Sequence, residues 1–124
     1  MEYKLNKHNV FVNPEVLEID KDLIINLASR NNKWYYGYIY DFSTLFASSP
    51  CMELDFESFN TRIDALKSAI NYLIKSIERQ LEVYQNYKEY ATVSKRMRKS
   101  ICNLKAYLYE ITHIQLSLFD EIYL

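Results

Sequence analysis

The chain has 124 residues, of which 49% are hydrophobic and 25% are charged, and its formal net charge is −1 at pH 7. This length predicts one domain with one modest core, and the composition is typical of a globular protein. The nearly neutral charge excludes a protein that coats nucleic acid through overall positive charge. Because the chain contains one glycine, glycine-rich phosphate loops and dinucleotide fingerprints are excluded as well.

The sequence favours a cytoplasmic protein without membrane contact. No signal peptide is recognisable, and no stretch approaches the roughly 20 apolar residues that a membrane helix needs. The two cysteines, Cys51 and Cys102, lie far apart and lack both CxxC spacing and neighbouring histidines. We therefore expect free thiols, no metal site and no cofactor.

We predict an α+β fold in a single domain that spans residues 1–124. Residues 1–59 form its β-rich part, residues 60–114 its helical part, and residues 115–124 a candidate docking segment. In the first part, short runs of β-branched and aromatic residues predict a hairpin over about residues 23–42, with its turn at Asn31-Asn32. An earlier strand is expected at 10–12 or 16–19. Residues 43–59 are expected to form a loop, with a short strand near 52–54.

After Asn60 the apolar residues recur every three or four positions, which predicts two long helices. Thr61 or Asn60 is a suitable N-cap for the first helix, with Asp64 in a capping-box-like position. The first seam contains Ile63, Leu66, Ile70, Leu73, Ile77, Leu81 and Tyr84. The second helix starts near Thr92 or Ser94, and its seam contains Met97, Ile101, Leu104, Leu108 and Ile111. The two helices form an antiparallel hairpin, or one long helix with a bend near residues 90–92.

Strand alternation over residues 33–42 places five aromatic side chains on one face of the hairpin. They are Trp34, Tyr36, Tyr38, Tyr40 and Phe42. Our main interpretation is that this face packs beneath the first helix. The alternative is an aromatic surface formed by the first four of them. Such a surface would suit a protein partner better than stacked bases, because only Lys33 supplies a positive charge nearby.

The second helix carries a group of basic residues, most of them opposite its apolar seam. The group contains Lys95, Arg96, Arg98, Lys99 and Lys105. A solvated helix face is one interpretation. The other is contact with DNA, RNA or an acidic protein surface, which would be sensitive to salt but would not read sequence.

The segment Gln115-Leu116-Ser117-Leu118-Phe119 resembles the pentapeptide by which bacterial replication and repair proteins bind the DNA sliding clamp. The resemblance implies that Gln115, Leu116, Leu118 and Phe119 contact the clamp. Continuing the helical seam would place polar Gln115 in its middle and Leu116 toward solvent, which favours an extended docking segment over a packed helix. Continuation of the helix and binding to another protein groove are the alternatives.

A looser resemblance links residues 23–75 to small uncharacterised proteins of phages and bacterial mobile elements. It depends on Trp34, Gly37-Tyr38, Ser49-Pro50, Thr61-Arg62 and Ala65-Leu66.

The chain shows no nucleophile elbow, and neither histidine has an acid or serine partner nearby in sequence.

We therefore expect no enzymatic activity but a protein-binding accessory or inhibitor protein of phage or mobile-element type. It would be tethered to the sliding clamp and act on host replication, repair or defence machinery. The alternatives are a nucleic-acid-binding protein that uses the basic helix as a monomer or as a homodimer through the helical seams, and an inhibitor that occludes a nucleic-acid-binding enzyme.

Overall fold

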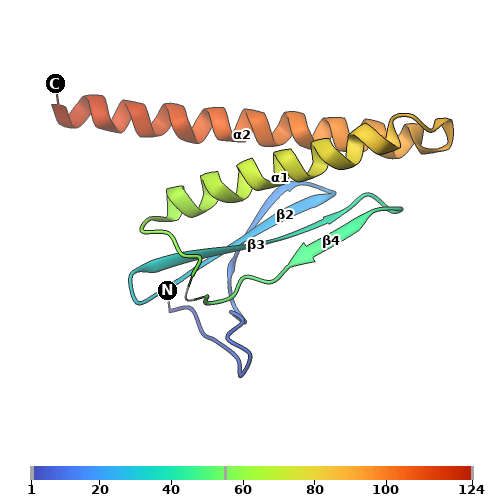
Figure 1. Cartoon of the computed structure of the whole chain (residues 1–124). Helices are drawn as coiled ribbons and strands as arrows, with labels where there is room; N and C mark the ends of the chain where they lie inside the picture. The colour runs from blue at the N-terminus through green and yellow to red at the C-terminus, as the bar shows by residue number, and fades with distance from the viewer. Residues whose placement is uncertain (1, 55, 124) are drawn as a thin grey trace.

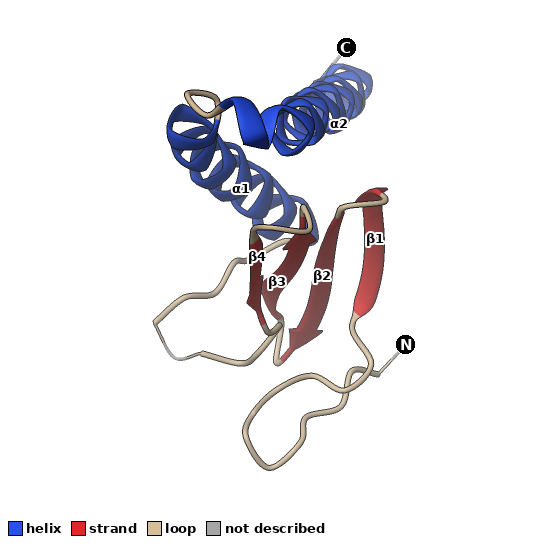
Figure 2. Ribbon diagram, turned by 90° about the vertical axis from the view of Figure 1, so that its right-hand side faces the viewer, coloured by secondary structure: helices blue, strands red, loops and turns tan. Residues whose placement is uncertain are grey.

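The fold is a four-stranded antiparallel sheet followed by two helices, as the sequence predicted. The computed structural model describes residues 2–54 and 56–123, and it describes side chains as far as residue 114. The strands are β1 (Glu15–Asp20), β2 (Leu23–Arg30), β3 (Lys33–Asp41) and β4 (Phe46–Ser49), in that order across the sheet. The helices are α1 (Arg62–Tyr84), the short 3₁₀ helix η1 (Lys88–Tyr90) and α2 (Ala91–Tyr123). Both long helices lie on the same side of the sheet (Figures 1 and 2).

The hairpin between β2 and β3 is confirmed, including its turn. Arg30 and Lys33 are paired across the end of the ladder. Asn31 and Asn32 between them have φ values of 55° and 63°. A two-residue turn with positive φ at both positions matches the twist of the strands, and asparagine reaches this conformation more easily than most residues.

Two details of the β-rich part differ from the sequence prediction. The segment expected to be a loop contains β4, which pairs with β3 through Tyr38↔Ser49 and Asp41↔Phe46. The short strand expected near residues 52–54 is reduced to one bridge between Val10 and Met52. The early strand occupies the later of its two predicted places, at β1. Strand β4 has only four residues, so its partner, and not its own pattern, determines its conformation.

Helix α1 begins where the cap was predicted. The Thr61 hydroxyl accepts a hydrogen bond of 3.1 Å from the backbone N–H of Asp64. At the first position of the helix, Arg62 pairs with Glu15 of β1 at 2.6 Å. The chain reverses between the end of α1 and the start of α2, a stretch that includes η1, and α2 returns alongside α1 as an antiparallel hairpin (Figure 1).

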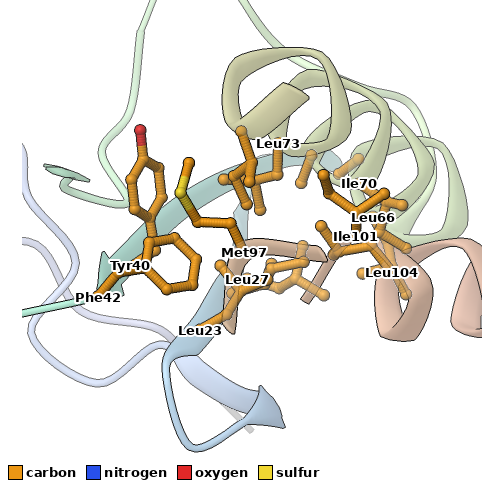
Figure 3. Close-up of a cluster of buried hydrophobic side chains, with 14 of the residues drawn as sticks. Leu23, Leu27, Tyr40, Phe42, Leu66, Ile70, Leu73, Met97, Ile101 and Leu104 are labelled. Atoms are coloured by element: carbon orange, nitrogen blue, oxygen red, sulfur yellow. The ribbon is translucent and has the colours of Figure 1, made fainter. Parts of the chain in front are cut away.

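The main core lies between the sheet and the helical hairpin. Strand β2 contributes Leu23, Ile25 and Leu27, all fully buried, and α1 contributes the fully buried Leu73. Met97 of α2 belongs to the same cluster (Figure 3). Each large aliphatic side chain buried in this way stabilises the fold by about 1.5–3 kcal/mol. The middle of each helical seam is thus buried within one chain, which leaves only the partly buried ends of the seams for the dimer contact that the sequence suggested.

A second, smaller cluster lies on the other face of the sheet. It consists of Phe11, Ala28, Tyr35 and Cys51. Gly37 on β3 permits the close approach of the chain that supplies Cys51, because a Cβ atom at position 37 would lie 2.4 Å from the backbone nitrogen of Cys51. The single glycine of the chain therefore serves packing at this point.

Candidate functional site

The five aromatic side chains at alternate positions from Trp34 to Phe42 face the helix layer, which confirms the main interpretation of the alternating pattern. Tyr40 is 3% exposed and belongs to the core, so its inclusion in an aromatic surface was wrong. Trp34 is half-buried and packs edge-to-face with Tyr3, with 6.1 Å between ring centroids. Tyr36 and Tyr38 are also half-buried, and both line a pocket at the surface.

This pocket, which we call the tyrosine pocket, has a volume of about 220 Å³. It is bounded by β3, by the end of β4, by the segment that joins β4 to α1, and by α1 itself. Tyr72 of α1 lies against Tyr38, with ring centroids 5.5 Å apart and hydroxyl oxygens 3.4 Å apart. Phe59 lies against Tyr36, with ring centroids 6.0 Å apart. Two pairs of aromatic rings therefore form much of its lining.

The electrostatics of the tyrosine pocket combine low polarity with a negative charge. Burial raises the pKa of Tyr36, and the neighbouring carboxylate of Glu57 raises it further. Burial also raises the pKa of Tyr38, and the Tyr72 hydroxyl adds to that effect. Both phenols are therefore neutral at physiological pH. Among the described residues that line the pocket, Glu57 is the one with a carboxylate, and none is a lysine or arginine.

Sequence reasoning found the β3 tyrosines but missed their partners in the pocket. Tyr72 directly precedes the seam residue Leu73, so the pattern alone gave it no role. Phe59 and Glu57 belong to a segment that was expected to be a loop. The pairing of Trp34 with Phe59, through reciprocal backbone hydrogen bonds of 2.7 and 3.0 Å, fixes that segment beside β3. Such a pairing has no signal in the local sequence.

The basic residues of α2 do not act as one group. Arg96 turns toward the sheet, where its guanidinium donates to both carboxylate oxygens of Asp22 and to the Ser43 hydroxyl. The Asp22 carboxylate is the largest cause of the raised pKa of Arg96. Assigning Arg96 to a surface for an anionic partner was therefore wrong, because the guanidinium is already engaged within the chain.

The other four basic residues of α2 are exposed. Lys105 lies 3.5 Å from Glu78 of α1, a weak surface pair. In the part of the chain that the structure describes, Lys95, Arg98 and Lys99 have no ion-pair partner. Three exposed cations therefore remain for an external anion.

Among the side chains that the structure describes, Ile111 is the last one of α2 that packs against the core, and Ile114 is 59% exposed. The helix continues to Tyr123, so the backbone at 115–119 follows the helical alternative. The side chains of Gln115, Leu116, Leu118 and Phe119 lie outside the described residues, and their role as a docking motif remains a prediction.

Both cysteines are free thiols, and they differ in environment. Cys51 is buried and Cys102 is exposed. Burial raises the pKa of Cys51 to about 12. Within the described residues, no group of three His, Cys, Asp or Glu side chains is placed to hold a metal ion. No helix in that part of the chain combines the length and apolar character of a membrane span.

Comparison with known proteins gives no match to a family model, to a curated protein or to a solved structure.

Proposed function

We propose that this protein is a non-enzymatic binding protein that docks on a bacterial DNA sliding clamp through Gln115, Leu116, Leu118 and Phe119. The observation that carries the proposal is the match of residues 115–119 to the full clamp-binding pentapeptide. Support also comes from position, since Ile114, directly before the motif, is 59% exposed. The resemblance of residues 23–75 to small phage and mobile-element proteins is consistent with an accessory or inhibitory role in host replication, repair or defence.

A helical backbone at this segment is compatible with docking in an extended form. Helix α2 has 33 residues and α1 has 23, so at about 1.5 Å per residue α2 is about 15 Å longer. Its last turns extend past the start of α1 (Figure 1). Helix ends fray at low free-energy cost. Binding would unwind α2 from residue 115 onward.

Calorimetry with a purified bacterial sliding clamp tests the proposal. We expect the wild-type chain to bind, and the double variant Gln115→Ala/Phe119→Ala to bind at least about tenfold more weakly, since one lost anchor contributes 1.4 kcal/mol or more. The matched control is Gln85→Ala/Phe56→Ala, which removes the same residue types at exposed positions outside the motif. Equal binding by the wild-type and motif variants, or no binding by either, would contradict the proposal.

The second candidate function is nucleic-acid binding by α2, favoured by the three exposed cations Lys95, Arg98 and Lys99. Such binding should weaken steeply as salt rises, because released counterions drive it. We expect Arg98→Glu/Lys99→Glu to abolish binding to a labelled DNA or RNA duplex, whereas the control Arg79→Glu/Lys75→Glu on α1 retains it. Absence of binding by the wild-type chain at low salt would remove this candidate.

A further inference from the structure

The tyrosine pocket has a recognition chemistry that clamp docking does not use. Its lining comes from β3, the end of β4, the segment between β4 and α1, and α1, all of which precede α2 in the chain. The rings of Tyr36, Tyr38 and Tyr72 are only partly covered, and Tyr72 is 43% exposed. The pocket is therefore open to a ligand from solvent.

We propose that the tyrosine pocket binds an arginine side chain presented by a protein partner. The pocket's aromatic lining and its carboxylate, Glu57, are complementary in charge to a cation. Aromatic faces attract cations through their negative quadrupole, and a nearby carboxylate strengthens that attraction. This second binding surface goes beyond the proposed docking on the sliding clamp.

The polar groups of the pocket favour a guanidinium over an ammonium group. A guanidinium is planar, so it stacks on aromatic rings, and it has five N–H donors to satisfy. Tyr36, Tyr38 and Tyr72, whose hydroxyl oxygens are able to accept hydrogen bonds, line the pocket together with Glu57 and its carboxylate. An ammonium group is more strongly hydrated and cannot stack, so it gains less from this lining. A volume of about 220 Å³ accommodates one such side chain.

The negative charge of Glu57 already affects another residue that lines the pocket. Its carboxylate is one of the causes of the raised pKa of Tyr36, so the two side chains share an electrostatic environment. The Glu57 carboxylate would attract a bound guanidinium and would repel a bound anion. The pocket therefore favours a positively charged ligand over a negatively charged one, whatever the shape of the ligand.

The methionines provide the measurement. Met52 lines the pocket, whereas Met97 is fully buried in the core between the sheet and the helices. In a full chain labelled with ¹³C at the methionine methyl groups, we titrate N-acetyl-arginine N-methylamide, with the citrulline and lysine analogues as matched probes. We expect a saturable shift of the Met52 methyl signal with the arginine probe, an unchanged Met97 signal, and at least tenfold weaker binding of the citrulline probe.

Two variants separate the pocket from general surface effects. Glu57→Gln should weaken binding of the arginine probe severalfold, and Tyr72→Ala should weaken it at least as much. The controls are Glu82→Gln and Tyr109→Ala, which change the same residue types at exposed positions that do not line the pocket. An unchanged Met97 signal shows that each variant is folded.

Three results would overturn the proposal. They are the absence of a saturable Met52 shift, equal binding of the arginine and citrulline probes, and equal binding of the arginine and lysine probes. None of these outcomes depends on the sliding clamp, so failure here is distinguishable from failure of the proposed function.

Discussion

The guanidinium Nη2 of Arg96 lies 2.5 Å from Oδ1 of Asp22, and this ion pair joins α2 to the turn between β1 and β2. Asp22 is almost fully covered, with 8% of its side chain exposed. Arg96 also donates to the carbonyl oxygens of Asp41 and Phe42 at 3.3 Å. One side chain of α2 therefore holds two loops at the same end of the sheet.

Removing either partner of this pair should destabilise the fold. We expect Arg96→Ala and Asp22→Asn each to lower the free energy of unfolding by about 2 kcal/mol, because each leaves the other group without its charged hydrogen bond. The double variant should lose less than the sum of the two, measured by urea denaturation. The neighbouring exposed Lys95→Ala should change stability by no more than about 0.5 kcal/mol. Additive effects would show that the pair is not coupled.

The same pair predicts how stability depends on acid pH. The hydrogen bond from Arg96 is the largest cause of the lowered pKa of Asp22, and Lys21 and Lys99 act in the same direction, whereas burial opposes them. Because the pKa of Asp22 in the folded chain lies below its ordinary value, the contribution of the pair is complete at neutral pH. It is lost as pH falls below about 4 toward the folded pKa. Denaturation curves between pH 6 and 3 should therefore be less pH-dependent in Asp22→Asn than in the wild type. Equal slopes would refute this linkage.

The close approach at Gly37 predicts a large effect from a single methyl group. In Gly37→Ala the new Cβ would lie 2.6 Å from the Ser49 carbonyl oxygen as well as 2.4 Å from the Cys51 nitrogen. Both obstacles are backbone atoms, so relief requires movement of the chain. We expect a loss of about 1–3 kcal/mol in the urea unfolding free energy. The control is Ser48→Ala, at an exposed position of β4. If Gly37→Ala and the wild type unfolded at the same urea concentration, the close packing at Gly37 would be contradicted.

The two thiols should differ strongly in reactivity. Cys102 is exposed on α2, whereas Cys51 is buried and its Sγ lies 3.5 Å from the Tyr35 carbonyl oxygen. Because the thiolate is the reactive form, burial protects Cys51 both by access and by its raised pKa. An aromatic disulfide reagent should label Cys102 quickly in the native chain and Cys51 only when the chain unfolds. Fast labelling that persists in Cys102→Ser would show that Cys51 is accessible.

The sequence predicted those parts of the fold that local physics determines. Asn31-Asn32 specified a hairpin turn by its access to positive φ, and Thr61 marked the start of α1 by its capping hydroxyl. The apolar seams predicted both helices because burial against one layer requires that spacing. Each of these signals lies within a few residues of the feature that it specifies.

The remaining features depend on contacts between distant segments. Arg96 belongs by sequence to a basic group, yet its partner Asp22 lies 74 positions earlier in the chain. Strand β4 forms because it pairs with β3. Tyr72 joins the tyrosine pocket because the turn of α1 that carries it lies over Tyr38 of β3. Helix periodicity gives the face on which a side chain lies but not the group that it meets. The candidate site was therefore predicted only in part.

The most direct test of the central claim is competition on the sliding clamp. A fluorescent peptide that carries residues 111–124 is bound to a purified bacterial clamp, and its anisotropy is followed as the full-length chain is added. We predict that the wild-type chain displaces the peptide, whereas Gln115→Ala/Phe119→Ala leaves it bound. A peptide that does not bind the clamp, or displacement by the wild-type and variant chains at the same concentration, would contradict the account.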